Sequence, residues 1–117
     1  MHAVVCRRDE LAPGEKRALD VGGRRSVLVR TGDGRYFALA DVCPHQGARL
    51  SDGHLGDELV AERVGERRLH RPAEILRCPW HNFAFDVTTG RSLLEPERYR
   101  VKTYPASVED GDVVVEV

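Results

Sequence analysis

Two short segments of the chain contain the residue types that bind metals. Residues 43–47 read Cys-Pro-His-Gln-Gly and residues 78–82 read Cys-Pro-Trp-His-Asn, so each supplies one thiolate and one imidazole. A cysteine sulfur and a histidine nitrogen in each segment can bind one soft or borderline metal ion, or can be divided between the irons of a cluster. The repeated Cys-Pro start indicates that the two segments act together. The candidate ligands are therefore Cys43, His45, Cys78 and His81.

The residues around these candidates favour two tight loops. A proline follows each cysteine, which fixes φ at that position and removes one backbone amide. Gly47 and Asn82 stand after the histidine segments, and both residue types tolerate the positive φ of a sharp turn. Such loops leave other backbone amides free to point at sulfur.

Two alternatives to a cluster use the same four residues. One is a pair of buried cysteines with two incidental histidines. The other is a structural zinc site, because two cysteines and two histidines are also a common zinc ligand set. A zinc finger usually has its cysteines in one segment and its histidines in another, whereas each segment here mixes the two types. The arrangement therefore favours a cluster over zinc.

The two segments resemble those of the Rieske family, whose pattern is Cys-x-His in one loop and Cys-x-x-His in a second. Both halves match without substitution, and the resemblance continues through residues 83–90. It implies a [2Fe-2S] cluster in an antiparallel, all-β fold with a small cluster-binding subdomain. By the same resemblance, Cys43 and Cys78 hold the inner iron. His45 and His81 hold the outer iron near the surface, where electrons enter and leave.

The chain departs from the family pattern in two places. The segment between His45 and Cys78 is longer than usual, because residues 51–74 form a charged excursion that we expect to leave the barrel without touching a ligand. The entropy of closing a loop grows slowly with its length, so this insertion is compatible with the cluster. The second departure is Asn82, where the family usually has glycine. Asparagine is the next best residue for a left-handed backbone.

The residues after the second loop predict a low reduction potential. In the Rieske proteins of respiratory and photosynthetic membrane complexes, a serine and a tyrosine at the positions of Phe83 and Phe85 donate hydroxyl bonds toward the cluster. Those proteins also have an extra cysteine in each loop, which form a disulfide. This chain lacks both hydroxyls and both extra cysteines. We expect a potential in the lower part of the range of roughly −150 to +300 mV typical of such centres.

The loops must be positioned by strands, because short β-rich runs recur between turn signals along the chain. The pattern predicts strands over residues 3–6, 16–21, 26–30, 35–40, 75–78, 83–87, 99–103 and 113–117. Hairpin turns are expected at residues 31–34 and 109–112, where glycine and aspartate tolerate positive φ. We therefore expect one all-β domain over residues 1–117, a small antiparallel barrel or sandwich.

Within the charged excursion, residues 58–71 have the composition of a hairpin centred on Gly65. The basic residues there could form a patch that faces a partner, but a solvated loop of mixed charge is the favoured interpretation. Outside the two loops, Cys6 is expected to be a small buried hydrophobe. His2, His54 and His70 are expected at the surface rather than at a metal.

Composition excludes several classes of function. The 117 residues include 18 Lys and Arg against 19 Asp and Glu, for a net charge of −1, which gives no basic field for nucleic acid. No apolar run approaches the roughly 20 residues that span a bilayer, and the first residues lack a signal-peptide layout. Three cysteines do not suggest a disulfide framework. We expect a cytoplasmic protein without membrane contact.

These observations indicate an electron carrier rather than an enzyme. The main hypothesis is a ferredoxin that passes single electrons from a flavin-containing reductase to a terminal oxygenase or a similar redox enzyme. Alternatives are a Rieske-like small subunit of a nitrite reductase and, less favoured, a zinc-stabilised interaction module. The sequence does not identify the donor, the acceptor, the final substrate or the oligomeric state.

Overall fold

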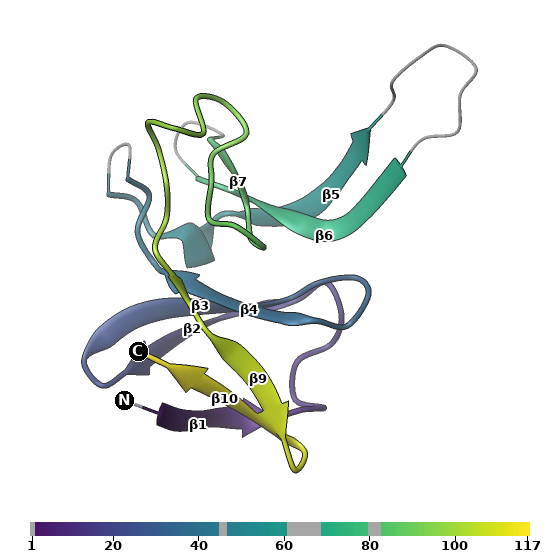
Figure 1. Ribbon diagram of the computed structural model, residues 1–117, viewed down its shortest axis with the longest axis vertical. Helices are drawn as coiled ribbons and strands as arrows, with labels where there is room; N and C mark the ends of the chain where they lie inside the picture. Colours follow the sequence, from purple (N-terminus) through teal and green to yellow (C-terminus); the bar gives the residue numbers. More distant parts are fainter. Residues whose placement is uncertain (1, 45–46, 61–68, 80–82) are drawn as a thin grey trace.

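Antiparallel strands in three sheets make up the computed structural model, which describes residues 2–44, 47–60, 69–79 and 83–117 (Figure 1). The sheets have the strand orders β1-β10-β9, β2-β3-β4-β8 and β5-β6-β7. The strands and one 3-10 turn are β1 His2–Arg7, β2 Lys16–Val21, β3 Arg24–Arg30, β4 Tyr36–Ala40, η1 Leu50–Asp52, β5 His54–Val60, β6 Leu69–Arg77, β7 Ala84–Asp86, β8 Thr103–Tyr104, β9 Ala106–Glu109 and β10 Asp112–Glu116. The expected all-β, antiparallel fold is confirmed.

The sheet that contains β3 is the middle layer of the molecule, with apolar side chains on both faces. Side chains alternate between the two faces of a strand. On β3, Val27 and Val29 belong to one buried cluster and Leu28 belongs to another. The first cluster also contains Leu76 of β6, and the second contains Val113 of β10. The β5-β6-β7 sheet therefore covers one face of the middle layer, and the β1-β10-β9 sheet covers the other (Figure 1).

Both expected hairpin turns are present. Between β3 and β4, the amide of Gly34 donates to the carbonyl oxygen of Thr31 at 2.9 Å, and Gly34 has φ of 89°. Between β9 and β10, Asp110 and Gly111 both have positive φ, at 52° and 82°. Two consecutive residues of positive φ match the right-handed twist of the flanking strands. The local sequence therefore determines both turns.

The prediction of a strand over residues 99–103 is wrong. Among the residues that the structure describes, Arg100 makes an isolated bridge with Arg91, and β8 begins at Thr103. Strand β9, which was not expected, has one partly buried residue followed by three exposed ones. An edge strand of this kind owes its conformation to its neighbour β10 rather than to its own apolar pattern.

The charged segment 51–74 is part of a sheet rather than an excursion from it. The hairpin centred on Gly65 is confirmed on its flanks, where Glu58 pairs with Arg71 and Val60 pairs with Leu69; its tip lies outside the described residues. The base of the same hairpin pairs His54 with Arg77, the residue before Cys78. The segment therefore supports the second candidate loop.

The described part of the chain contains no α-helix, and so no helix there has the length and apolar character needed to cross a bilayer.

Candidate metal centre

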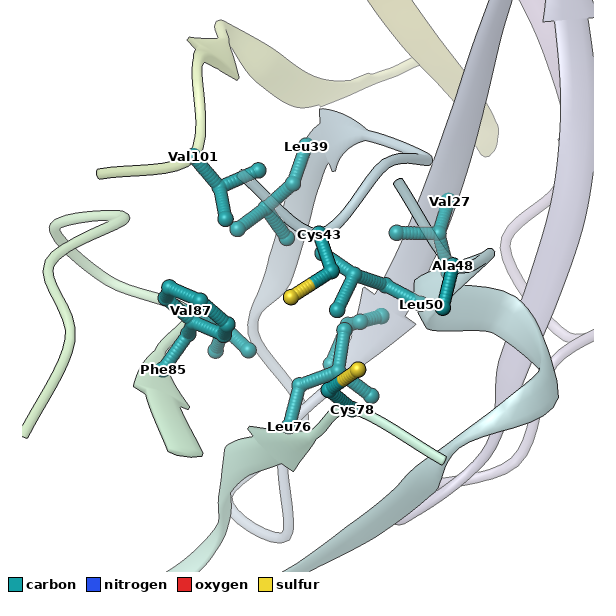
Figure 2. Packing of buried hydrophobic residues seen from close by; sticks show 11 residues of the cluster. Val27, Leu39, Cys43, Ala48, Leu50, Leu76, Cys78, Phe85, Val87 and Val101 are labelled. Atoms are coloured by element: carbon teal, nitrogen blue, oxygen red, sulfur yellow. The ribbon is translucent and has the colours of Figure 1, made fainter. Parts of the chain in front are cut away.

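Two of the four predicted ligands, Cys43 and Cys78, are side chains of the same buried cluster. Their exposed fractions are 1% and 2%. Figure 2 shows both sulfur atoms among the apolar side chains of this cluster, which come from the middle sheet, η1, β6, β7 and the connecting segments. His45 and His81 lie outside the described residues, so their part in the site stays a prediction.

Each cysteine begins a loop that is closed by the same kind of backbone hydrogen bond. The amide of Cys43 donates to the carbonyl oxygen of Ala48 at 2.8 Å, and the amide of Cys78 donates to that of Phe83 at 2.7 Å. In both loops the acceptor is the fifth residue after the cysteine. The sequence enclosed by each bond contains one proline and one candidate histidine. The two loops therefore have the same backbone closure, and each closure starts at the cysteine.

Backbone and side-chain hydrogen bonds hold the first loop at both of its ends. Gly47 has φ of 79° and its amide donates to the carbonyl oxygen of Cys43 at 2.7 Å, which confirms its expected role in the turn. Asp41, two residues before Cys43, accepts hydrogen bonds from the amide and the hydroxyl of Ser51, both at 2.6 Å. The carboxylate of Asp41 thus ties the end of β4 to η1, which follows the loop.

The second loop is held by β6 and β7, which pair up to the residues that flank it. Arg77 pairs with Ala84 across the mouth of the loop. On the other side, a Cβ atom on Gly53 would lie 1.7 Å from the carbonyl oxygen of Arg77. Only glycine allows this approach, so the chain that leaves the first loop packs directly against the residue that precedes Cys78.

Three aromatic rings cover the side of the site next to the second loop. Phe83 and Phe85 are stacked with ring centroids 6.0 Å apart, and the rings of Phe83 and Tyr99 form a T-shaped pair with centroids 5.0 Å apart. Phe85 is fully buried, while Phe83 and Tyr99 are partly buried against the cluster of the two cysteines. The side chains at positions 83 and 85 therefore provide an apolar wall without a hydroxyl. Trp80 lies outside the described residues.

The third cysteine, Cys6, lies outside the candidate site. Cys6 is buried in the second cluster, between β1, the middle sheet and β10, and burial raises the pKa of its thiol. Its expected role as a small buried hydrophobe is confirmed. His2 is exposed and lies 3.4 Å from Glu109, and His54 is also exposed, as expected for surface residues.

The described part of the site fits a centre that takes two thiolates. All three cysteines of the chain are thiols rather than disulfides. Buried thiols are frequently inert core residues, as Cys6 is. Cys43 and Cys78 differ from Cys6 because each starts a loop closed by the same kind of hydrogen bond, and both lie in one hydrophobic cluster. Thiolate is the ligand that iron–sulfur clusters require.

Three residues that support the site were not identified from the sequence. Asp41 could have been noticed, because it is a carboxylate placed directly after the apolar run 36–40 and two residues before Cys43. The sequence pattern places Tyr99 in a strand and does not indicate its contact with Phe83. Gly53 has an ordinary negative φ of −84°, so nothing local distinguished it before the fold brought Arg77 beside it.

Comparisons with known proteins agree on one family. The model described as "Rieske [2Fe-2S] domain" matches residues 1–105. The 3-phenylpropionate/cinnamic acid dioxygenase ferredoxin subunit of Photorhabdus laumondii subsp. laumondii is 31% identical over 113 residues, which are 97% of this chain and 91% of that protein.

Two solved structures have similar folds. A chain from the complex of reduced oxygenase and oxidized ferredoxin in carbazole 1,9a-dioxygenase is 26% identical, with a TM-score of 0.75 over 97% of this chain and 100% of that one. A putative NADH-dependent nitrite reductase small subunit from Mycobacterium tuberculosis is 28% identical, with a TM-score of 0.76 over 100% of this chain and 96% of that one.

Proposed function

The chain belongs to the Rieske [2Fe-2S] domain family, and from this premise we propose that it is a ferredoxin that delivers single electrons to a terminal oxygenase. The family's cofactor is a [2Fe-2S] cluster, and family membership decides against the zinc alternative. We assign Cys43, His45, Cys78 and His81 as the cluster ligands. The observation that carries this assignment is the matching closure of two loops whose cysteines share one buried cluster.

The donor types at these positions determine the charge that the fold must accommodate. A bound [2Fe-2S] cluster supplies a centre that gains and loses one electron. Two thiolates balance the formal charge of two ferric ions and two sulfides, and two neutral imidazoles add none. The chain therefore surrounds a centre of zero formal charge when oxidised and of one negative charge when reduced.

The two sides of the site have different tasks in this proposal. Cys43 and Cys78 are nearly inaccessible to solvent, so the protein excludes water on the cysteine side. By resemblance to the family, His45 and His81 stand on the outer side, where a partner can approach. Electrons would then pass through the imidazole edges rather than through the apolar wall of Phe83 and Phe85.

Named relatives support a carrier rather than an enzyme. The relative from Photorhabdus is a dioxygenase ferredoxin subunit, and the carbazole 1,9a-dioxygenase structure contains a ferredoxin together with its oxygenase. We propose a flavin-containing reductase as the donor, an oxygenase as the acceptor and the cytoplasm as the location. Strands β9 and β10 follow the matched residues and lie in one sheet with β1, where β10 pairs with β1, which supports one domain over residues 1–117.

A nitrite reductase small subunit is the second candidate, because the structure from Mycobacterium tuberculosis has the same fold at a similar identity. The two functions differ in the acceptor. The dithionite-reduced protein should be mixed without oxygen, in separate experiments, with the oxygenase and the nitrite reductase large subunit encoded in the same genome. Reoxidation of the visible absorbance by the oxygenase alone supports the ferredoxin. Reoxidation by the nitrite reductase alone would overturn it.

A further inference from the structure

Four cations line the outer face of the chain between β7 and β8, and we call them the basic strip: Arg91, Arg98, Arg100 and Lys102. All four are exposed. Three of them alternate along the segment with Tyr99 and Val101, which face inward and pack against the cluster that contains both site cysteines. Because side chains alternate in an extended chain, the cations share the outer face.

Arg91 and Arg100 lie directly opposite each other in an antiparallel bridge. The amide of Val101 donates to the carbonyl oxygen of Gly90 at 2.7 Å, and the amide of Ser92 donates to that of Tyr99 at 3.0 Å. These two bonds flank the arginines, which makes them a non-hydrogen-bonded pair, the type in which opposed side chains lie closer together. Like charges at opposed positions destabilise a sheet.

The described residues do not neutralise this repulsion. Among them, only Arg98 of the strip has an ion-pair partner, Glu95 at 3.7 Å. Arg91, Arg100 and Lys102 form no ion pair with any described residue, although Lys102 lies 5.5 Å from the ring centroid of Tyr104. The whole chain has a net charge of −1, so a general excess of cations does not explain the strip.

The strip lies beside the proposed centre. Tyr99, between Arg98 and Arg100, meets the ring of Phe83, and the carbonyl oxygen of Phe83 accepts the amide that closes the second loop at Cys78. In Figure 1 the chain carrying the strip descends from the end of the molecule that holds the two loops toward β9. A partner that touches the strip would therefore also be next to the site of electron exchange.

We propose that the basic strip docks an acidic protein surface on the electron-transfer partner. This inference rests on the proposed function and adds the chemistry of the partner's docking surface. Exposed charges act within roughly 8 Å at physiological ionic strength, so the strip acts on the surface that contacts it rather than at long range. Complementary charge at such a contact raises the rate of productive encounter. The net negative chain lacks the broad positive field that nucleic acid requires.

The test compares two double variants with the same change in net charge. Arg91→Gln/Arg100→Gln removes the opposed pair of the strip. Arg7→Gln/Arg8→Gln removes two exposed arginines at the end of β1, whose sheet covers the face of the middle layer opposite to Cys43 and Cys78. The dithionite-reduced proteins are oxidised by ferricyanide, an anion, and by tris(phenanthroline)cobalt(III), a cation. Each oxidant takes one electron from the reduced protein.

At low ionic strength, the strip variant should react with ferricyanide about three- to tenfold more slowly than wild type and with the cobalt complex faster. The β1 variant should match wild type within about twofold, and high salt should remove the difference. If the two variants changed the oxidation rates equally, or if neither changed them, the claim that the basic strip creates a local positive potential at the centre would be overturned.

A protein partner supplies the second measurement. With the oxygenase that accepts electrons from the wild type, the strip variant should show the same loss of rate and a flatter salt dependence. Equal rates for wild type and both variants would overturn the docking proposal and leave the proposed function intact. Transfer from the wild type to no oxygenase would instead overturn the proposed function. Binding of a labelled DNA duplex by the wild type, lost in the strip variant, would assign the strip to nucleic acid and overturn the proposal.

Discussion

The carbonyl oxygen of Phe83 accepts a 2.7 Å hydrogen bond from the amide of Cys78. This bond closes the second loop and fixes residue 83 immediately beside the proposed cluster. The side chain at this position is a phenyl ring that stacks on Phe85 and forms a T-shaped pair with Tyr99. The groups nearest the loop therefore contribute apolar surface rather than hydroxyl hydrogen bonds, which bears directly on the reduction potential.

We predict a reduction potential below about +100 mV, within the range known for such centres. Phe83→Ser should raise it relative to Phe83→Ala, because both variants lose the ring but only serine adds a donor. A hydrogen bond that favours the reduced state by about 1 kcal/mol corresponds to about 40 mV for a one-electron couple. Redox titration of the three proteins measures the shift, and equal potentials for the serine and alanine variants would contradict it.

Gly53→Ala should abolish cluster binding, because its Cβ would meet the carbonyl oxygen of Arg77 at 1.7 Å and displace the residue before Cys78. Gly23→Ala is the matched control, since a Cβ at Gly23 meets nothing within 4 Å. The control has its own cost of roughly 1–2 kcal/mol from a φ of 83°, yet it should retain the cluster. Iron content per chain after purification distinguishes Gly53→Ala, which should lack iron, from Gly23→Ala, which should retain it. Full iron content in Gly53→Ala would show that the contact does not position Cys78.

The ion pair between Arg35 and Glu74 joins the middle sheet to β6 and should stabilise the fold. Its atoms lie 3.1 Å apart, and the side chain of Glu74 is only 9% exposed. Since Arg35 is half exposed, Arg35→Gln should cost about 1–2 kcal/mol, less than the loss of a fully buried pair. Arg17→Gln, which breaks an exposed pair with Glu10, should cost less than about 0.5 kcal/mol. Urea unfolding measures both, and equal costs would exclude a special role for Glu74.

The thiol of Cys6 should react slowly with alkylating reagents near pH 8. Burial raises the pKa of the Cys6 thiol, so less of the reactive thiolate is present near pH 8. In the holoprotein, iodoacetamide should modify none of the cysteines rapidly. After chelation of the iron, Cys6 should still react slowly at pH 8, and its rate should rise as pH increases. Mass spectrometry identifies the modified cysteines, and rapid labelling of Cys6 at pH 8 would contradict the prediction.

The sequence predicts most strongly where local residues alone determine the structure. Strand β2 has the expected bounds, and the turns at Gly34 and Gly111 follow from residues that adopt positive φ. The hairpin centred on Gly65 appears in the pairing of Val60 with Leu69. The cysteine loops were also recognisable, because a repeated Cys-Pro pattern is a local feature.

Features that depend on pairing or contacts outside the segment itself were not predictable. Strand β9 is nearly all exposed and forms because β10 pairs with it. The segment with Tyr99 and Val101 alternates like a strand, yet within the described ranges of the chain it makes one bridge, between Arg91 and Arg100. Gly53 acquires its role from the approach of Arg77, which no pattern in its own neighbourhood indicates.

The central claim is that two cysteines and two histidines of this chain hold one [2Fe-2S] cluster. Pulsed EPR of the dithionite-reduced protein tests it most directly, because nitrogen ligands of the iron couple to the unpaired electron. We predict two strongly coupled histidine nitrogens in the wild type and in Cys6→Ala, with one of them lost in His45→Ala or His81→Ala if the cluster persists. A reduced iron–sulfur signal without nitrogen coupling, or a colourless protein with one zinc per chain, would contradict the account.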